Sequence, residues 1–161
     1  MDKIVTFSEI KNLSRQYKDS KRTIVFTNGC FDIIHAGHVK YLTRAASLGD
    51  VLILGLNSDR SVKSIKGEKR PVVGQDHRSI VVAALTCIDH VVLFDEPDPG
   101  ILIEAVCPDV LVKGADWPED QIIGADFVKK NGGCIKRICL EPDIYTTKII
   151  ERIGELYYGK N

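Results

Sequence analysis

The sequence predicts an α/β protein built on a doubly wound, five-stranded parallel sheet with helices on both faces. Five apolar segments of strand length recur along the chain, and segments with helical punctuation lie between them. The apolar segments are nearly continuous rather than alternating, which is typical of strands buried on both faces. Right-handed crossovers then give a three-layer sandwich that binds ligands at the carboxyl ends of its strands.

The first predicted element is an amphipathic helix. Its start is marked by Thr6 and Glu9, which have the spacing of a capping box. Gly49 marks the end of the helix after the first strand, and the Asp98–Pro99 pair marks the start of the helix before the fourth. A further helix ends at the glycine pair 132–133. The predicted strands are TIVFT (23–27), VLILGL (51–56), HVVLF (90–94), DVLVK (109–113) and CIKRICL (134–140).

Charge and hydropathy exclude several functional classes. The chain balances 22 basic against 22 acidic residues, so it offers no general attraction for nucleic acid or an anionic membrane. Its apolar runs are far shorter than the ~20 residues of a bilayer span, and its N-terminus lacks the apolar stretch of a signal peptide. Five cysteines without CxxC spacing indicate buried thiols in a reducing compartment. We therefore expect a cytoplasmic protein whose partners are small molecules, with no nucleic-acid or membrane partner.

The segment TNGCFDIIHAGH (27–38) carries most of the predicted chemistry. A loop of small residues that leads from a strand to a helix N-terminus exposes backbone N–H groups, and the helix dipole adds about half a positive charge there. His35 and His38 are three residues apart, so both rings project to one side, where two imidazoles can donate to one phosphate. Gly37 between them allows a ligand to approach the backbone. This context favours phosphate binding over the alternatives, which are a surface pair or half a metal site.

Residues 57–76 form the one long polar stretch and are predicted to be an active-site loop. Gly67 permits this loop to fold over a ligand, and Lys66 and Arg70 have the charge to neutralise phosphates. A solvated charged loop is the alternative. Arg78 begins the next helix, and its position fits a phosphate contact or a structural ion pair equally well.

The segment VKGADW follows the fourth predicted strand. Gly114 and Ala115 are small enough for a base and ribose to lie against the backbone, and Asp116 can accept from hydroxyl groups. Trp117 either stacks on a base or fills space beside the loop.

A second phosphate-binding position is predicted near the C-terminus, in YTTKIIERI. Thr146 and Thr147 stand at the start of a predicted helix. Their hydroxyls and the free N–H groups of the first turn can bind a phosphate together.

The segment TNGCFDIIHAGH resembles the His-x-Gly-His segment of the cytidylyltransferase-like nucleotidyltransferase superfamily. Further along, NSDRSVKSIKGEKRPV (57–72), the Arg78 helix with AALTCIDHVVLF, PDVLVKGADW (108–117) and ADFVKKNGGC (125–134) resemble, in order, the heptose 1-phosphate adenylyltransferases of ADP-heptose synthesis. The resemblance covers residues 22–153. It implies a Rossmann-like fold of the nucleotidyltransferase type and a single domain over 1–161, with 1–21 as N-terminal helix and lead-in and 22–153 as catalytic core. We expect the free-standing form, without the sugar kinase domain often fused to this family.

The resemblance implies transfer of AMP from Mg-ATP to D-glycero-D-manno-heptose 1-phosphate, giving ADP-heptose and pyrophosphate for bacterial surface glycans, in a homo-oligomer. The attacking sugar-phosphate oxygen is already ionised, so the enzyme has to supply alignment and donors rather than a base. Mg²⁺ is expected to bridge phosphates rather than to occupy a protein site. The implied catalytic residues are His35, His38 and Lys66; the nucleotide contacts are Thr27, Asn28, Gly29, Cys30, Phe31, Gly37, Gly114, Ala115, Asp116, Thr146 and Thr147; and the sugar-phosphate contacts are Asp32, Asn57, Arg70, Arg78 and Trp117.

The chain departs from the family pattern Gly-x-Ser-Thr-Thr, because Asp143 and Tyr145 replace the glycine and the serine. Negative charge near a triphosphate weakens ATP binding or changes which nucleotide or acceptor fits. Alternatives therefore stay open: a cytidylyltransferase acting on glycerol 3-phosphate or another small phosphate ester, and a non-catalytic nucleotide-binding subunit. A fragment of an aminoacyl-tRNA synthetase is disfavoured, because no basic face is available for tRNA.

Overall fold

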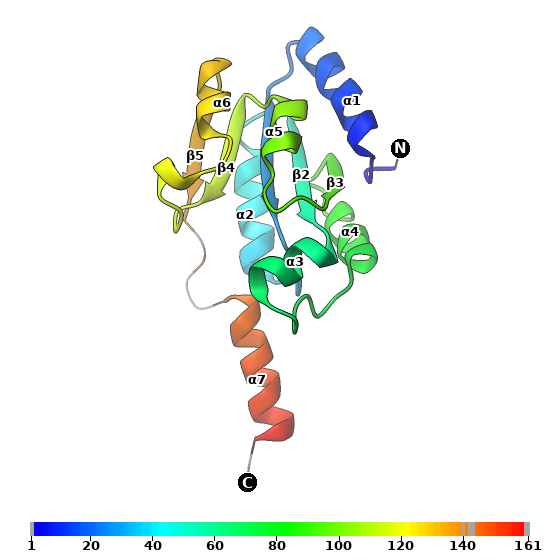
Figure 1. Cartoon of the computed structure of the whole chain (residues 1–161), viewed down its shortest axis with the longest axis vertical. Helices are drawn as coiled ribbons and strands as arrows, with labels where there is room; N and C mark the ends of the chain where they lie inside the picture. The colour runs from blue at the N-terminus through cyan, green and yellow to red at the C-terminus, as the bar shows by residue number, and fades with distance from the viewer. Residues whose placement is uncertain (1, 140, 142–143, 160–161) are drawn as a thin grey trace.

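The computed structural model describes residues 2–139, 141 and 144–159 of the chain. Five parallel strands form one sheet in the order β3-β2-β1-β4-β5 (Figure 1). The chain moves outward from β1 to β3 and then crosses back to β4, so the direction of winding reverses between β1 and β4. The predicted doubly wound α/β fold is therefore confirmed. The strands are β1 (Ile24–Gly29), β2 (Val51–Asn57), β3 (His90–Phe94), β4 (Val110–Gly114) and β5 (Cys134–Ile138).

Helices cover both faces of the sheet. The helices are α1 (Phe7–Asp19), α2 (Ala36–Ala46), α3 (Asp59–Lys66), α4 (Gln75–Ala83), α5 (Gly100–Val106), α6 (Ala125–Lys130) and α7 (Thr146–Tyr158), with a 3₁₀ turn at Glu119–Gln121. Residues of α1, α5 and α6 pack in one hydrophobic cluster, and residues of α2 and α4 pack in the other. The two clusters lie on opposite sides of the sheet, which confirms the three-layer sandwich.

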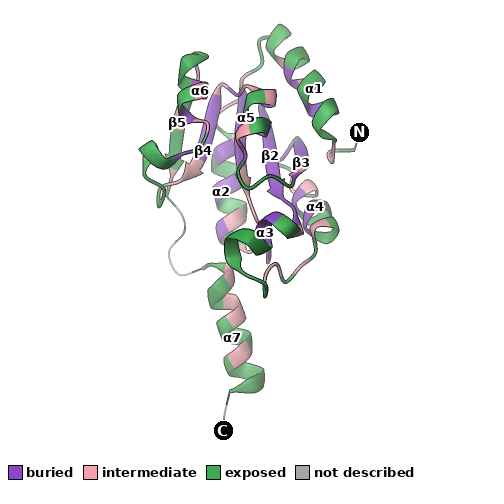
Figure 2. Ribbon diagram, viewed as in Figure 1, coloured by how far each residue is buried: buried purple, intermediate pink, exposed green. Residues whose placement is uncertain are grey.

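Successive side chains along the central strands belong alternately to the two hydrophobic clusters. In β1, Ile24 and Phe26 belong to the first cluster and Val25 belongs to the second, and all three are fully buried. Successive side chains of a strand point to opposite faces, so a strand that is apolar at every position requires a cover on each side. Figure 2 shows the central strands as the buried layer between helices whose outer faces are exposed.

The N-terminal segment protects one edge of the sheet. The predicted capping box is present, because the amide of Glu9 donates to Thr6 Oγ1 at 3.3 Å and the amide of Thr6 donates to Glu9 Oε2 at 2.7 Å. Before α1, Ile4 forms a parallel bridge with Val91 of β3. An otherwise unpaired strand edge is thereby covered, which limits edge-to-edge association.

The stretch 57–76 is not the continuous loop that its polarity predicts, because α3 occupies its first half. Ser58 caps this helix by accepting from the amide of Ser61, and Val62 is fully buried against the sheet. Tertiary contact through one apolar side chain and a good cap is enough for two helical turns. The loop proper spans residues 67–74.

The expectation of buried thiols is also wrong. All five cysteines are free; Cys134 and Cys139 are exposed and the other three are half-buried. Cys134 begins β5, the outer strand of the sheet, where side chains on both faces stay partly accessible.

The last helix, α7, projects away from the sandwich (Figure 1). None of its residues is buried, and the apolar side chains of Ile153 and Leu156 are exposed. Neither α7 nor any other helix among the described residues is long and apolar enough to cross a membrane.

Candidate active site

A cavity of about 540 Å³ opens where β1 and β4 end. Asn28 and Gly29 at the end of β1, and Lys113 and Gly114 at the end of β4, line its floor. These two strands flank the point at which the winding of the sheet reverses, which is where open α/β sheets bind their ligands. The N-terminal ends of α2 and α7 also border the cavity.

His35 and His38 meet at the start of α2, as their spacing predicts. Their rings are stacked, with centroids 3.7 Å apart and planes 22° apart, and the ring of Phe31 lies 5.2 Å from that of His38. The Nδ1 atoms of both histidines are buried with no hydrogen-bond partner among the described residues. His35 is the N-cap residue of α2, yet its side chain caps no helical N–H group. The helix therefore begins with free N–H groups beside two imidazoles whose hydrogen-bonding capacity is unused.

Burial keeps both imidazoles uncharged at neutral pH. It lowers the pKa of His35, and it lowers the pKa of His38 to about 4, with a smaller contribution from the neighbouring His35. The pair consequently offers neutral hydrogen-bond donors rather than two positive charges.

The turn after β1 is shaped by tight packing. A Cβ at Gly29 would lie 2.8 Å from the ring of Phe31, so only glycine fits there. Phe31 itself has a positive φ of 43°. Burial raises the pKa of the Cys30 thiol, which makes it a poor nucleophile.

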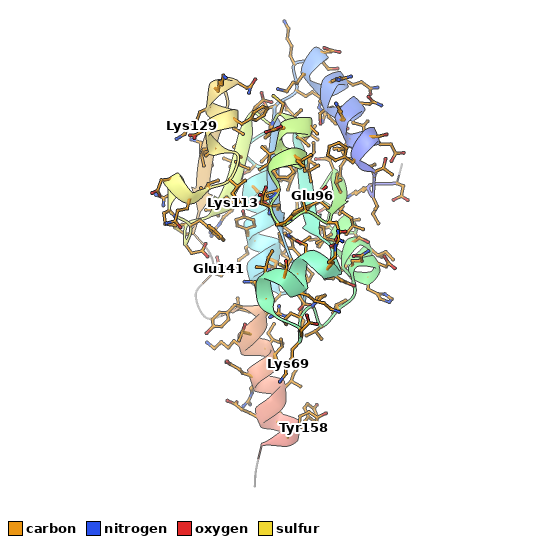
Figure 3. All side chains as sticks on the ribbon, in the orientation of Figure 1. Lys69, Glu96, Lys113, Lys129, Glu141 and Tyr158 are labelled. Carbon is orange, nitrogen blue, oxygen red and sulfur yellow. The ribbon has the colours of Figure 1, made fainter. Side chains whose placement is uncertain are left out.

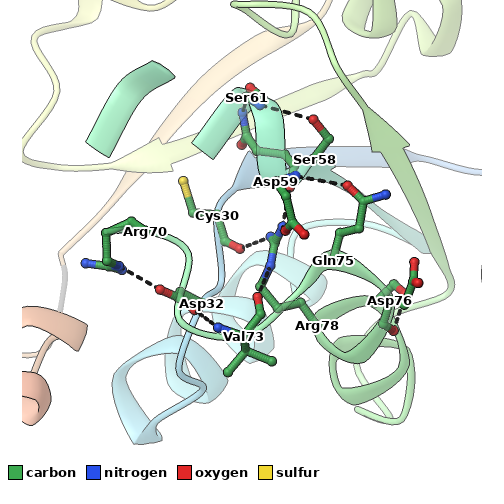
Figure 4. Close-up of polar contacts among 12 residues, drawn as sticks. Cys30, Asp32, Ser58, Asp59, Ser61, Arg70, Val73, Gln75, Asp76 and Arg78 are labelled. Carbon is green, nitrogen blue, oxygen red and sulfur yellow. Dashed lines mark hydrogen bonds and ion pairs between the residues drawn. The ribbon is translucent and has the colours of Figure 1, made fainter. Parts of the chain in front are cut away.

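Arg78 lies beneath this turn and is fully buried. Its Nε donates to the carbonyl of Val73 at 2.9 Å and its Nη1 donates to the carbonyl of Cys30 at 2.5 Å. Its Nη2 donates to the carbonyl of Asn57 at 2.9 Å and to Asp59 Oδ1 at 2.8 Å (Figure 4). Protein acceptors thus occupy four of its five N–H groups, and Arg78 does not line the cavity. The structural alternative holds, and the assignment of Arg78 as a phosphate contact is corrected.

Asp32 ties the loop 67–74 to the turn after β1. Its buried carboxylate accepts from Arg70 Nε at 2.6 Å and from the amides of Val72 and Val73 at 2.9 and 2.8 Å (Figure 4). Burial by itself raises the pKa of Asp32, but these hydrogen bonds together lower it below its usual value. Asp32 is therefore an anchor for the loop; it also lines the cavity, and its assignment as a sugar-phosphate contact stays a prediction.

Two predicted nucleotide contacts do not reach the cavity. The hydroxyl of Thr27 is buried between the hydroxyl of Tyr41 at 2.8 Å and the carbonyl of Val112 at 3.0 Å. Ala115 donates its N–H to the carbonyl of Ile138 at 2.9 Å, extending the pairing of β4 with β5. Both residues support the site from outside, so their assignment as ligand contacts is corrected.

The remaining predicted site residues do line the cavity. Lys66 is exposed at the rim, and Asn57 lies deeper, where its amide donates to Ser61 Oγ at 2.9 Å. Thr146 and Thr147 open α7, as expected, and Tyr145 is the N-cap residue without a capping hydrogen bond. Asp143 lies outside the described residues. The lining residues that sequence reasoning identified are Asn28, Gly29, Cys30, Phe31, Asp32, His35, Gly37, His38, Asn57, Lys66, Arg70, Gly114, Asp116, Trp117, Thr146 and Thr147.

Sequence reasoning missed several lining residues. Lys113 is the most informative, because it brings a cation to the floor of the cavity. Its signal was available, since a lysine that ends an apolar strand faces the ligand edge of a parallel sheet. An apolar wall was also missed; it consists of Ile65, Pro97, Pro99, Ile122, Ile123 and Ile144.

Comparisons with known proteins agree with this geometry. The model of the family described as cytidylyltransferase-like matches residues 26–152. The chain is 51% identical over 140 residues to bifunctional protein HldE of Geobacter sulfurreducens, covering 87% of this chain and 29% of that protein. It is 45% identical over 155 residues to bifunctional protein HldE of Helicobacter acinonychis, covering 96% of this chain and 32% of that protein. The chain thus spans about a third of the length of these curated relatives.

A solved structure shares the fold. The lipopolysaccharide core biosynthesis protein of Thermoplasma volcanium is similar with a TM-score of 0.62 and 27% sequence identity. The similarity covers 74% of this chain and 97% of that one.

Proposed function

The chain belongs to the cytidylyltransferase-like family and is a nucleotidyltransferase, and we propose that it transfers AMP from ATP to D-glycero-D-manno-heptose 1-phosphate. The observation that carries this proposal is the stacked pair of His35 and His38 at the open N-terminus of α2, facing the cavity at the switch point of the sheet. Relatives named bifunctional HldE, and a similar structure named for lipopolysaccharide core biosynthesis, support the sugar-nucleotide class of product.

In the proposed reaction an oxygen of the sugar phosphate attacks the α-phosphorus of ATP, and the bond from that phosphorus to the bridging oxygen of pyrophosphate breaks. The attacking oxygen is ionised at neutral pH, so no general base is required. His35 and His38 donate hydrogen bonds to the α-phosphate oxygens, where negative charge concentrates in the transition state. Because both rings are neutral and fixed by stacking, they donate without reorganising during the reaction.

Two hydroxyl groups and one cation are available to bind the departing pyrophosphate. Thr146 and Thr147, with the free N–H groups of α7, bind the distal phosphates, and Lys66 neutralises them from the rim. Among the described residues no group of three or more His, Cys, Asp or Glu side chains can hold a metal ion. In the proposed reaction Mg²⁺ would be carried by the phosphates, whose charge it would neutralise.

The test is a matrix of four nucleoside triphosphates against several phosphate esters, with pyrophosphate release as the readout. We expect release with ATP and heptose 1-phosphate, and loss of release in a His35→Ala/His38→Ala double variant purified in parallel. A preference for CTP with glycerol 3-phosphate would replace the proposed substrates by the alternative within the same family. Light scattering on the same samples measures the proposed homo-oligomer.

A further inference from the structure

Lys113 is a cation that the reaction scheme above leaves unused. It is the fourth residue of β4 and lies half-buried on the floor of the cavity, where its Nζ donates to Oδ1 of Asn28 at the end of β1. Figure 3 shows Lys113 near the centre of the molecule, whereas Lys69 and Lys129 lie at its periphery. We propose that Lys113 binds the phosphate of the acceptor and holds it for attack; this inference rests on the proposed nucleotidyl transfer.

The surroundings of Lys113 call for an anion. In the described part of the chain its ammonium forms no ion pair, and its one hydrogen bond is to a neutral amide. Burial lowers the pKa of Lys113 to about 8, against a smaller opposing effect of Asp116. A desolvated ammonium without a charged partner is unfavourable. A phosphate dianion in the cavity would provide that partner.

The position of Lys113 favours the acceptor phosphate over the phosphates of the nucleotide. The N-termini of α2 and α7, which bind the nucleotide in the proposed reaction, lie next to each other, since Gly37 adjoins the side chain of Ile144. Lys113 instead belongs to β4 of the sheet, and its Nζ contacts Asn28 at the end of β1. In-line transfer requires the attacking oxygen and the departing pyrophosphate on opposite sides of the α-phosphorus. A cation on the floor is suitably placed for the attacking phosphate when the pyrophosphate lies at the helix N-termini.

The experiment compares Lys113→Met, which keeps the length of the side chain without its charge, with Lys113→Arg, which keeps a charge. Lys113→Met is expected to raise the KM for heptose 1-phosphate by about 10- to 100-fold, the loss expected for a hydrogen bond to a charged group. The dissociation constant of Mg-ATP, measured by calorimetry, stays unchanged, and Lys113→Arg recovers most of the acceptor affinity. Lys136→Met is the matched control, because Lys136 is exposed on β5 and does not line the cavity. Weaker ATP binding with an unchanged acceptor KM would overturn the proposal, as would equal kinetics of Lys113→Met and the control.

A pH profile distinguishes a lysine that binds the acceptor from one with a purely structural role, because a structural lysine would not alter the pH dependence of kcat/KM. In wild type, kcat/KM for the acceptor falls as pH rises through about 8, because the free enzyme loses the charge of Lys113. The Arg variant lacks this alkaline decline, since a guanidinium does not titrate there. Other titratable groups near Lys113 are Asp116, Tyr41, His38 and Arg137; burial lowers the pKa of His38 to about 4 and raises that of Tyr41 to about 12, so neither titrates near 8. An identical decline in both proteins would contradict the assignment.

Failure of the proposed function is distinguishable from failure of this inference. If wild type releases no pyrophosphate with any pair of substrates, the nucleotidyl transfer is wrong. Calorimetric titration of inorganic phosphate into wild type and Lys113→Met then tests Lys113 alone. Weaker phosphate binding in the variant supports the inference, and equal binding overturns it.

Discussion

Two groups of polar side chains beside the same cavity differ in how fully they are paired. The buried network consists of Arg78, Asp32 and Asp59. Arg78 donates to Asp59 and to the carbonyl of Val73, and the neighbouring amide of Val72 donates to Asp32, so nearly every donor in the network is used. In the phosphate wall, which consists of His35, His38 and Lys113, ring nitrogens have no partner among the described residues and the ammonium has only a neutral one. The network holds the site in shape, and the unpaired groups of the wall support the proposal that it binds a ligand.

Removing Arg78 should have the largest effect, and it should act on stability. Arg78→Met leaves three carbonyls and the carboxylate of Asp59 without their donor. We expect the free energy of unfolding to fall by about 3–5 kcal/mol, because each buried carbonyl left without a donor costs about 1–3 kcal/mol. Urea denaturation followed by circular dichroism measures this loss.

Arg60→Met provides the control for that experiment. Arg60 pairs with Asp95 on the surface, and its side chain is 79% exposed. An exposed ion pair contributes at most about 1 kcal/mol. If the two variants were equally stable and only Arg78→Met lost activity, Arg78 would act with the phosphate wall and not as part of the buried network.

His38→Ala should have the opposite signature. Turnover is expected to fall by about 10²- to 10³-fold, because one donor to the transition state is lost. Stability should stay close to that of wild type, since the imidazole has a buried nitrogen that nothing in the described structure satisfies. Pyrophosphate release and a thermal melt on the same sample separate the two quantities. A variant that melts early and keeps its turnover would place His38 in the network instead.

The low pKa of His38 predicts a pH-dependent stability with a definite sign. The folded value is about 4, below the ordinary 6.5, so between these pH values the unfolded chain binds a proton that the folded chain does not. The free energy of unfolding of wild type, relative to His38→Asn, should therefore decrease as pH falls from 6.5 towards 4 and should be constant above 6.5. Denaturation curves at five pH values check this, and a difference that does not vary with pH would show that His38 is not desolvated.

The smallest expected effect concerns the start of α7. Tyr145→Ser supplies a side chain that can accept from the first turn, which is worth about 1 kcal/mol at an N-cap. Amide hydrogens in the first turn of α7 should then exchange about fivefold more slowly with solvent, because 1.4 kcal/mol corresponds to tenfold. Tyr158→Ser, at the other end of α7, is the control and should leave these rates unchanged. Unaltered exchange in Tyr145→Ser would mean that this helix end is already satisfied.

Most of the fold could be predicted because its information is local. The central strands consist mainly of apolar residues, as at 51–56 in β2, and the capping box of Thr6 and Glu9 lies within four residues. Helix α3 was missed because only one of its side chains, Val62, anchors it strongly to the core. A short, mostly polar helix reads as a loop until the sheet that it packs on is known.

The site was predicted where chemistry is local and mispredicted where partners are distant. The pairing of His35 with His38 follows from a spacing of three residues. The pairing of Asp32 with the loop spans 38 to 41 residues, and the bond from Thr27 to Val112 spans 85. A polar residue near a phosphate loop has the same sequence signature whether it faces a ligand or a distant carbonyl. Only the tertiary structure separates the two.

A crystal structure of the protein with Mg²⁺ and a non-hydrolysable ATP analogue tests the proposed roles of His35 and His38 most directly. We expect ring nitrogens of both residues to lie within hydrogen-bonding distance of the α-phosphate, with the distal phosphates at the start of α7. An analogue bound with its phosphates elsewhere in the cavity, and with the two imidazoles turned away from them, would contradict the proposed function.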